Sequence, residues 1–112
     1  MSDNPIRVLQ IIRSMNQGGA ENFIMNVYRN INKNKIQFDF LVYKEGFFDD
    51  EIRKMGGKIF YGKYITEIGQ RKYCKDLLEF YKEHPEYQIV HSHLDQVSGI
   101  ILEVAKKARS KG

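Results

Sequence analysis

The chain has 112 residues, enough for one domain with a modest hydrophobic core. Its hydrophobic content of 42% and charged content of 29% are ordinary for a globular protein, and its net charge of +4 permits an anionic partner without selecting one. The single cysteine, Cys74, excludes an internal disulfide and a cysteine-based zinc cluster, which fits a cytoplasmic protein, and no apolar run approaches the ~20 residues of a membrane span.

The first expected strand is a near-continuous apolar run from Val8 to Ile12, of the kind that a strand covered on both faces requires. A polar turn follows and ends in two glycines, Gly18 and Gly19. After them the apolar residues adopt helical spacing and predict one buried stripe, formed by Ala20, Phe23, Ile24, Val27 and Ile31.

This order of strand, glycine turn and helix places free backbone N–H groups and the positive end of a helix dipole at the carboxyl end of the strand. Such a place binds anions, most commonly phosphate. The pair Gly18-Gly19 is a weak signal by itself, because the G-x-G-x-x-G fingerprint and the phosphate-loop motif are both absent. A sharp turn that needs positive φ would also explain the glycines, and Glu21 would suit the first turn of a helix without any substrate.

The rest of the chain predicts three more strands, at residues 37–43, 58–61 and 88–92, and three more helices, at residues 47–55, 70–83 and 96–109. Residues 62–69 are expected to form a loop. Strands and helices therefore alternate, which predicts an α/β fold. It would be a Rossmann-like three-layer sandwich with a mainly parallel sheet of about four strands.

In parallel sheets of this kind, ligands bind beyond the carboxyl ends of the strands. Residues 14–21, after the first strand, and residues 91–98, after the fourth, would both lie at that edge. If the fourth strand pairs with the first, the two loops flank the point where the strand order reverses. That point is the predicted ligand site.

His91 and His93 are two residues apart at the end of the fourth strand, so their side chains can point the same way. Three interpretations compete: a metal site, which lacks a third ligand at suitable spacing; a structural pair with one buried histidine; and a pair of substrate contacts. His84, beside Pro85, is expected at an exposed helix end. Cys74 is expected to pack rather than to react.

Two stretches of the sequence are rich in basic residues, and each has a structural interpretation and a functional one. The tail is expected to be a solvated helix end, the alternative being nucleic-acid binding without aromatic stacking partners; its residues are Lys106, Lys107, Arg109 and Lys111. The helix at 70–83 is either an ordinary amphipathic helix or part of a peripheral membrane contact. Its basic residues are Arg71, Lys72, Lys75 and Lys82, and its apolar neighbours are Tyr64, Ile65, Ile68 and Tyr73.

Three segments, in this order, resemble a known family: GGAENFIMNVYRNI, then IQFDFLVYKEG with DDEIRKMGGKIF, then IVHSHL with SGIILEVAKKA. They are similar to the amino-terminal domain of bacterial family 4 glycosyltransferases, in particular those of exopolysaccharide synthesis. The resemblance covers residues 7–108. It implies a GT-B architecture, in which two Rossmann-like domains face each other across a cleft. The carboxy-terminal domain would hold most of the nucleotide-sugar donor, and residues 1–112 would form the amino-terminal, acceptor-side domain.

The resemblance also implies site residues: donor-phosphate binding by Gly18, Gly19 and Ala20, catalysis by His93 beside the donor sugar, and acceptor-side contacts by Glu21 and Ser92. Enzymes of this family retain anomeric configuration and need no metal or other cofactor, so the histidines would not be metal ligands. The implied partners are a nucleotide-sugar donor and a glycan or lipid-linked acceptor, without nucleic acid. The expected location is the cytoplasm or the inner face of the membrane.

Two departures from the family pattern matter. Gln88 stands where the family often has aspartate before I-V-H-x-H. The chain also stops after the fourth helix, without a further strand and without the donor domain. We therefore expect the amino-terminal part of a longer enzyme of polysaccharide or glycoconjugate synthesis, inactive by itself. The alternatives are a stand-alone, non-catalytic nucleotide- or partner-binding Rossmann-like domain, and a module that binds an acidic partner through its basic helix.

Overall fold

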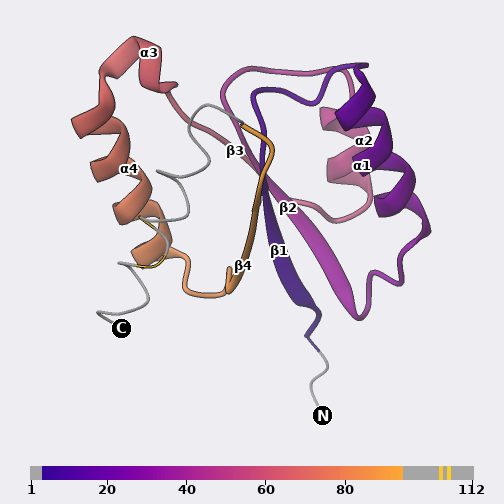
Figure 1. Cartoon of the computed structure of the whole chain (residues 1–112). Coiled ribbons are helices and arrows are strands. Elements are labelled where there is room, and N and C mark those ends of the chain that lie inside the picture. Colours follow the sequence, from indigo (N-terminus) through magenta and orange to yellow (C-terminus); the bar gives the residue numbers. More distant parts are fainter. Residues whose placement is uncertain (1–3, 95–103, 105, 107–112) are drawn as a thin grey trace.

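The computed structural model describes residues 4–94, 104 and 106, in which four strands and four helices follow one another (Figure 1). The strands are β1 (Ile6–Ile11), β2 (Ile36–Val42), β3 (Ile59–Tyr61) and β4 (Ile89–Ser92). The helices are α1 (Gly19–Asn30), α2 (Asp49–Lys54), α3 (Ile65–Ile68) and α4 (Gln70–Glu83). The helix expected at 96–109 lies outside the described residues, except for Val104, which is helical and buried, and Lys106, which is helical and exposed.

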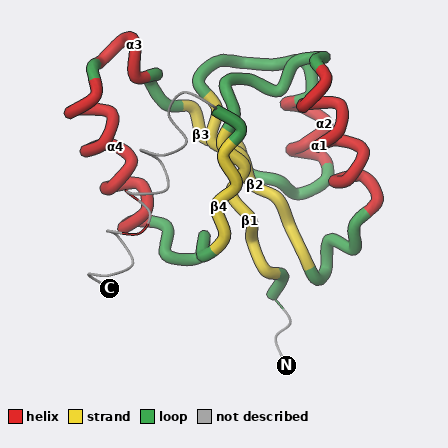
Figure 2. Tube along the Cα trace, in the orientation of Figure 1, coloured by secondary structure: helices red, strands yellow, loops and turns green. Residues whose placement is uncertain are grey.

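The strands form one parallel sheet in the order β3-β2-β1-β4. Val8 of β1 is in register with Phe38 of β2 on one side and with Ile89 of β4 on the other. Parallel neighbours need crossover connections, which the helices supply: α1 and α2 lie on one face of the sheet and α4 on the other (Figure 1 and Figure 2). The predicted α/β Rossmann-like fold is confirmed, and β4 pairs with β1 as the predicted ligand site requires.

The face of α1 that packs on the sheet differs from the predicted stripe. Ile24, Met25 and Tyr28 are buried, whereas Phe23 is 68% exposed and Val27 is 36% exposed. The helix is turned by about one residue, or roughly 100°, from the orientation that the apolar spacing predicts.

Tyr28 explains this difference. Its ring stacks on Phe38 with the ring centroids 5.2 Å apart, and its hydroxyl donates a hydrogen bond to the side chain of Gln37. Burial, followed by the charge of Asp39, raises the pKa of Tyr28 to about 12. Because its hydroxyl has a hydrogen-bond partner, Tyr28 can occupy the centre of the core. The predicted stripe included only aliphatic residues and Phe23, so it did not contain Tyr28.

On the other face, α4 packs on β1 and β2 through Tyr73, Leu77 and Tyr81. Cys74 is half-buried and packs against the same core, as expected. The segment 62–69 is not a loop throughout, since it contains α3. This helix has only four residues, too few for a periodic pattern to appear in the sequence.

Two further expectations concern the surroundings of α4. Tyr64 is buried, and Ile65 and Ile68 pack against the core, so the apolar neighbours of the basic residues are not available to a membrane. This burial favours the interpretation of α4 as an ordinary amphipathic helix over that of a peripheral membrane contact. His84 is half-buried rather than exposed, because its ring packs on that of Phe80 with the centroids 4.5 Å apart. Within the described residues, no helix has the length and apolar character needed to cross a bilayer.

A buried carboxylate connects the strands near their amino ends. Asp39 is fully buried in β2, and both of its oxygens lie 2.8 Å from the guanidinium of Arg7 in β1. The backbone N–H of Lys58, just before β3, and the hydroxyl of Tyr87, just before β4, donate to the same carboxylate. A buried charge is stable only when it is paired and hydrogen-bonded, and here all the partners come from neighbouring segments of the sheet.

Candidate functional site

The loops after β1 and β4 begin side by side. The backbone N–H of His93 donates to the carbonyl oxygen of Ile11 at 2.8 Å, which extends the pairing of the two strands beyond the end of β4. Since α1 starts at Gly19 after β1, the glycine turn and the H-x-H segment both follow the carboxyl ends of adjacent strands (Figure 1). The arrangement on which the predicted ligand site depends is therefore present.

His93 is held by a buried glutamine that the sequence analysis did not single out. Nε2 of His93 lies 2.8 Å from Oε1 of Gln10, a residue of β1 that is only 3% exposed. A carboxamide oxygen carries no proton, so Nε2–H of the histidine is the donor. In the neutral ring, this leaves Nδ1 as a hydrogen-bond acceptor. A polar residue within the apolar run of β1 was the signal that could have identified Gln10.

The ring of His91 lies beside that of His93, with the centroids 4.3 Å apart. Burial, and secondly the charge of His91, lower the pKa of His93 below its ordinary value of 6.5. His93 is therefore neutral at neutral pH. Among the residues that the structure describes, no three His, Cys, Asp or Glu side chains are grouped so as to hold a metal ion.

Neither Gly18 nor Gly19 has positive φ. Gly18 is extended, with φ −122° and ψ 178°, and in the described part of the chain only Gly56 and Gly69 have positive φ. A sharp turn that needs positive φ is thus the wrong explanation for this pair. A Cβ added at Gly19 would meet nothing within 4 Å, so the fold of the described residues does not require glycine there.

The amino-terminal end of α1 keeps most of its donors free of partners within the helix. The N–H of Gly18 donates to Asn16 at 2.9 Å, and the N–H of Asn22 donates to Gly18, also at 2.9 Å. The N–H groups of Gly19 and Ala20 lie in the first turn of α1, where no carbonyl oxygen of the helix is available to accept them. No side chain caps this end of the helix.

Glu21 lies over the start of the helix. Its Oε1 would be 2.6 Å from a Cβ at Gly18, so its carboxylate covers that residue. A negative charge here is favourable to the helix dipole, as the ordinary explanation of Glu21 predicts. An anionic ligand at the same place would have to displace this flexible side chain. Ser92 is half-buried, and its Oγ accepts the N–H of Leu94 at 3.3 Å.

Two more side chains at this edge were missed in the sequence. The exposed guanidinium of Arg13, directly after β1, lies 4.3 Å from the ring centre of Tyr64 and adds a positive charge to the rim. The side-chain oxygen of Asn16 accepts the N–H of Phe47 at 2.9 Å and so connects the loop after β1 to the loop after β2. Neither contact is visible without the parallel pairing of the strands.

The parallel sheet with helices on both faces defines an α/β domain of the Rossmann-like class, and in this class the edge that carries the start of α1 and His93 is the usual place for a ligand. A comparison with known proteins gives a particular relative. The chain is 36% identical over 110 residues to the protein named "Putative glycosyltransferase EpsF" of Bacillus subtilis (strain 168). This alignment covers 96% of the chain but 29% of the relative, so the chain spans less than a third of that protein's length.

The similarity to this relative confirms the resemblance to a bacterial glycosyltransferase. No protein-family model matches the chain, and no solved structure matches it significantly.

Proposed function

We propose that residues 1–112 form the acceptor-side domain of a GT-B glycosyltransferase of family 4. The intact enzyme would move a sugar from a nucleotide-sugar donor to an acceptor hydroxyl of a glycan or lipid-linked acceptor, with retention of anomeric configuration. The observation that carries this proposal is that the open start of α1 and the Gln10-bound His93 follow the carboxyl ends of two adjacent strands, β1 and β4. The relative's name supplies the class of reaction.

In this proposal, the start of α1 stabilises the departing phosphate. The amides of Gly19 and Ala20 donate to its oxygens, and the positive end of the helix dipole opposes the charge that develops as the bond to the sugar breaks. Gly18 contributes space rather than a donor, because its own N–H is bonded to Asn16. Arg13 lies on the same rim and adds a full positive charge. This stabilisation comes from fixed groups of the chain.

His93 positions the donor sugar. Its Nε2–H is committed to Gln10, so the neutral ring offers Nδ1 to a sugar hydroxyl. Holding the sugar against the phosphate site orients the anomeric carbon for transfer, which is the main catalytic effect available to such a site. Glu21 and Ser92 lie beside these groups and are the acceptor-side candidates. A separate donor domain would close over this edge, so residues 1–112 alone would not transfer sugar.

The test uses the longer protein that the proposal requires, assayed with UDP-, GDP- and dTDP-linked sugars. Gly19→Val should lower turnover by at least about tenfold, because the side chain fills the space in which the phosphate must approach the amides. Asn26→Val is the matched control, since it places the same β-branched side chain on an exposed position of α1. Both variants should keep the wild-type circular dichroism spectrum.

Two results would contradict the proposal: turnover of Gly19→Val equal to that of Asn26→Val, or a reading frame that ends at Gly112. Tight nucleotide binding by residues 1–112 alone, without sugar transfer by any longer product, would indicate the stand-alone binding domain instead.

A further inference from the structure

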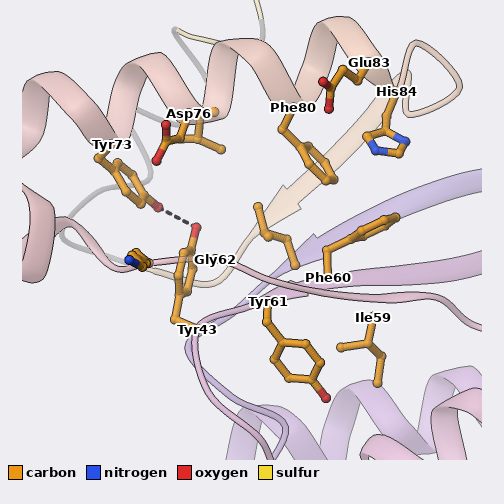
Figure 3. Close-up of a pocket in the computed structure, with 13 residues that line it drawn as sticks. Tyr43, Ile59, Phe60, Tyr61, Gly62, Tyr73, Asp76, Phe80, Glu83 and His84 are labelled. Atoms are coloured by element: carbon orange, nitrogen blue, oxygen red, sulfur yellow. Dashed lines mark hydrogen bonds between the residues drawn. The ribbon is translucent and has the colours of Figure 1, made fainter.

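A pocket of about 530 Å³ lies between the edge strand β3 and helix α4, on the opposite face of the sheet from α1 (Figure 3). This volume is within the usual range for small-ligand sites, roughly 300–1,000 Å³. Gly62 and Lys63, which follow β3, and Tyr43, which follows β2, line one end. The pocket therefore reaches the sheet rim that carries Gly19 and His93, while its lining residues are different.

The floor of the pocket is aromatic. The rings of Phe60 and Phe80 meet edge to face with their centroids 5.0 Å apart, and the ring of His84 lies 4.9 Å from Phe60. All three side chains are only partly buried, so apolar ring surface faces the pocket. A flat aromatic surface of this kind accepts the C–H face of a ring-shaped ligand.

Two carboxylates on α4 flank this floor. Asp76 and Glu83 are seven residues apart, with Phe80 between them, so the three share one face of the helix. Both carboxylates line the pocket. Asp76 accepts Lys72 at 3.0 Å, and Glu83 forms no hydrogen bond or ion pair within the described residues. Carboxylates only accept hydrogen bonds, so the matching ligand groups are donors.

The end of the pocket that Tyr43 lines offers a hydrogen-bond donor. The hydroxyls of Tyr43 and Tyr73 are 2.8 Å apart and share one hydrogen bond (Figure 3). Two hydroxyls carry two protons, so one proton is left for a ligand oxygen. Burial raises the pKa of both tyrosines, which keeps both protons in place.

We propose that this pocket binds a neutral pyranose ring. A sugar has a C–H face for Phe60 and Phe80, hydroxyl protons for Asp76 and Glu83, and an oxygen for the tyrosine pair. An alkyl chain would desolvate the carboxylates without forming a hydrogen bond. Asp76 is already paired with Lys72, so an anionic nucleotide would be repelled by Glu83 and attracted by Lys63, whereas a neutral ring avoids this repulsion. Because β3 lies two strands from β1, the ring held here would be a non-reacting unit of the acceptor. That role rests on the proposed transferase function, whereas sugar binding itself does not.

The test is an NMR titration of the 112-residue chain with methyl β-D-glucopyranoside and methyl α-D-mannopyranoside. At least one should cause saturable shifts of the Phe60 and Phe80 ring signals. Glu83→Gln, which keeps the shape and removes the charge, should weaken binding by roughly tenfold. Glu79→Gln is the matched control, because Glu79 is exposed on α4 and does not line the pocket. Phe80→Leu should abolish the sugar-dependent shifts of the Phe60 ring signals while the amide signals away from the pocket stay in place.

Sorbitol, which has the hydroxyls but no ring face, should cause no saturable shift. Saturation by sorbitol, saturation by hexanol but by neither sugar, or equal effects of Glu79→Gln and Glu83→Gln would overturn the proposal. The two proposals fail separately. A transferase whose β3–α4 pocket ignores sugars would refute only this inference, and sugar binding without any transfer activity would refute only the proposed function.

Discussion

Gln10 and His93 come from the two strands that meet at the switch point, and their side chains share a hydrogen bond of 2.8 Å. Gln10 lies in β1 with its side chain buried, so its carboxamide oxygen has a fixed position. The oxygen selects the Nε2–H form of the neutral histidine. Gln10 thus positions the ring of His93.

Gln10→Leu should remove the preference of neutral His93 for the Nε2–H tautomer. We expect the ring nitrogen signals of His93 to shift from the Nε2–H tautomer toward a mixture, as measured by long-range nitrogen–proton NMR at neutral pH. Gln10→Glu should instead retain the tautomer and raise the pKa of His93, because a carboxylate favours the charged ring. Gln17→Leu is the control, because Gln17 is an exposed residue of the loop after β1. An unchanged tautomer in Gln10→Leu would refute the role of Gln10.

The lowered pKa of His93 predicts a pH dependence of stability. Above about pH 6.5 the histidine is neutral in both the folded and the unfolded chain, so it contributes no difference. Below that pH, the unfolded chain takes up a proton that the folded chain resists, because of burial first and His91 second. The free energy of unfolding should therefore fall as the pH decreases toward the folded pKa.

Urea unfolding between about pH 7.5 and pH 5 measures this slope. The slope should be smaller in His93→Gln, which does not titrate there. His91→Asn should raise the pKa of His93 toward its ordinary value, since it removes the second cause of the shift. An NMR titration of His93 that is identical in His91→Asn and in the wild type would contradict this account.

Asp39→Ala should be strongly destabilising. It leaves the partly buried Arg7 and the hydroxyl of Tyr87 without their acceptor, and breaking a buried ion pair costs about 3–5 kcal/mol. Asp50→Ala is the comparison, because Asp50 pairs with Arg53 at 3.2 Å with its side chain 89% exposed. Exposed pairs contribute at most about 1 kcal/mol. Similar unfolding midpoints in urea for the two variants would show that the Asp39 contacts are weak.

Two glycines should respond oppositely to alanine. A Cβ at Gly46 would lie 2.7 Å from backbone atoms of Met15, which cannot move without shifting the loop after β1. Gly46→Ala should therefore cost about 1–3 kcal/mol of stability. A Cβ at Gly19 has open space around it, so Gly19→Ala should be neutral or stabilising by up to about 1 kcal/mol. Thermal unfolding of both variants checks the contrast, and a loss of stability in Gly19→Ala as large as that in Gly46→Ala would contradict it.

The sheet could be predicted from the sequence because buried parallel strands produce near-continuous apolar runs, as in Val8–Ile12. Contacts between distant residues could not. The orientation of α1 depends on the hydrogen bond of Tyr28 to Gln37, and the form of His93 depends on Gln10, whose distance from it in sequence hides the contact. The sequence placed Gly18 and Gly19 correctly at the start of a helix. Only their φ angles and surroundings showed that positive φ is not the reason for glycine there.

The partners of Asp39 lie at or before the amino ends of the strands, whereas the candidate ligand groups lie beyond the carboxyl ends. The two ends can therefore change under separate selection. If the proposed function holds, substitutions around Gly19, Glu21 or Ser92 would alter ligand recognition without loosening the contacts that keep the sheet assembled. A scaffold divided in this way can acquire new specificities through many small steps, each of which leaves the protein folded.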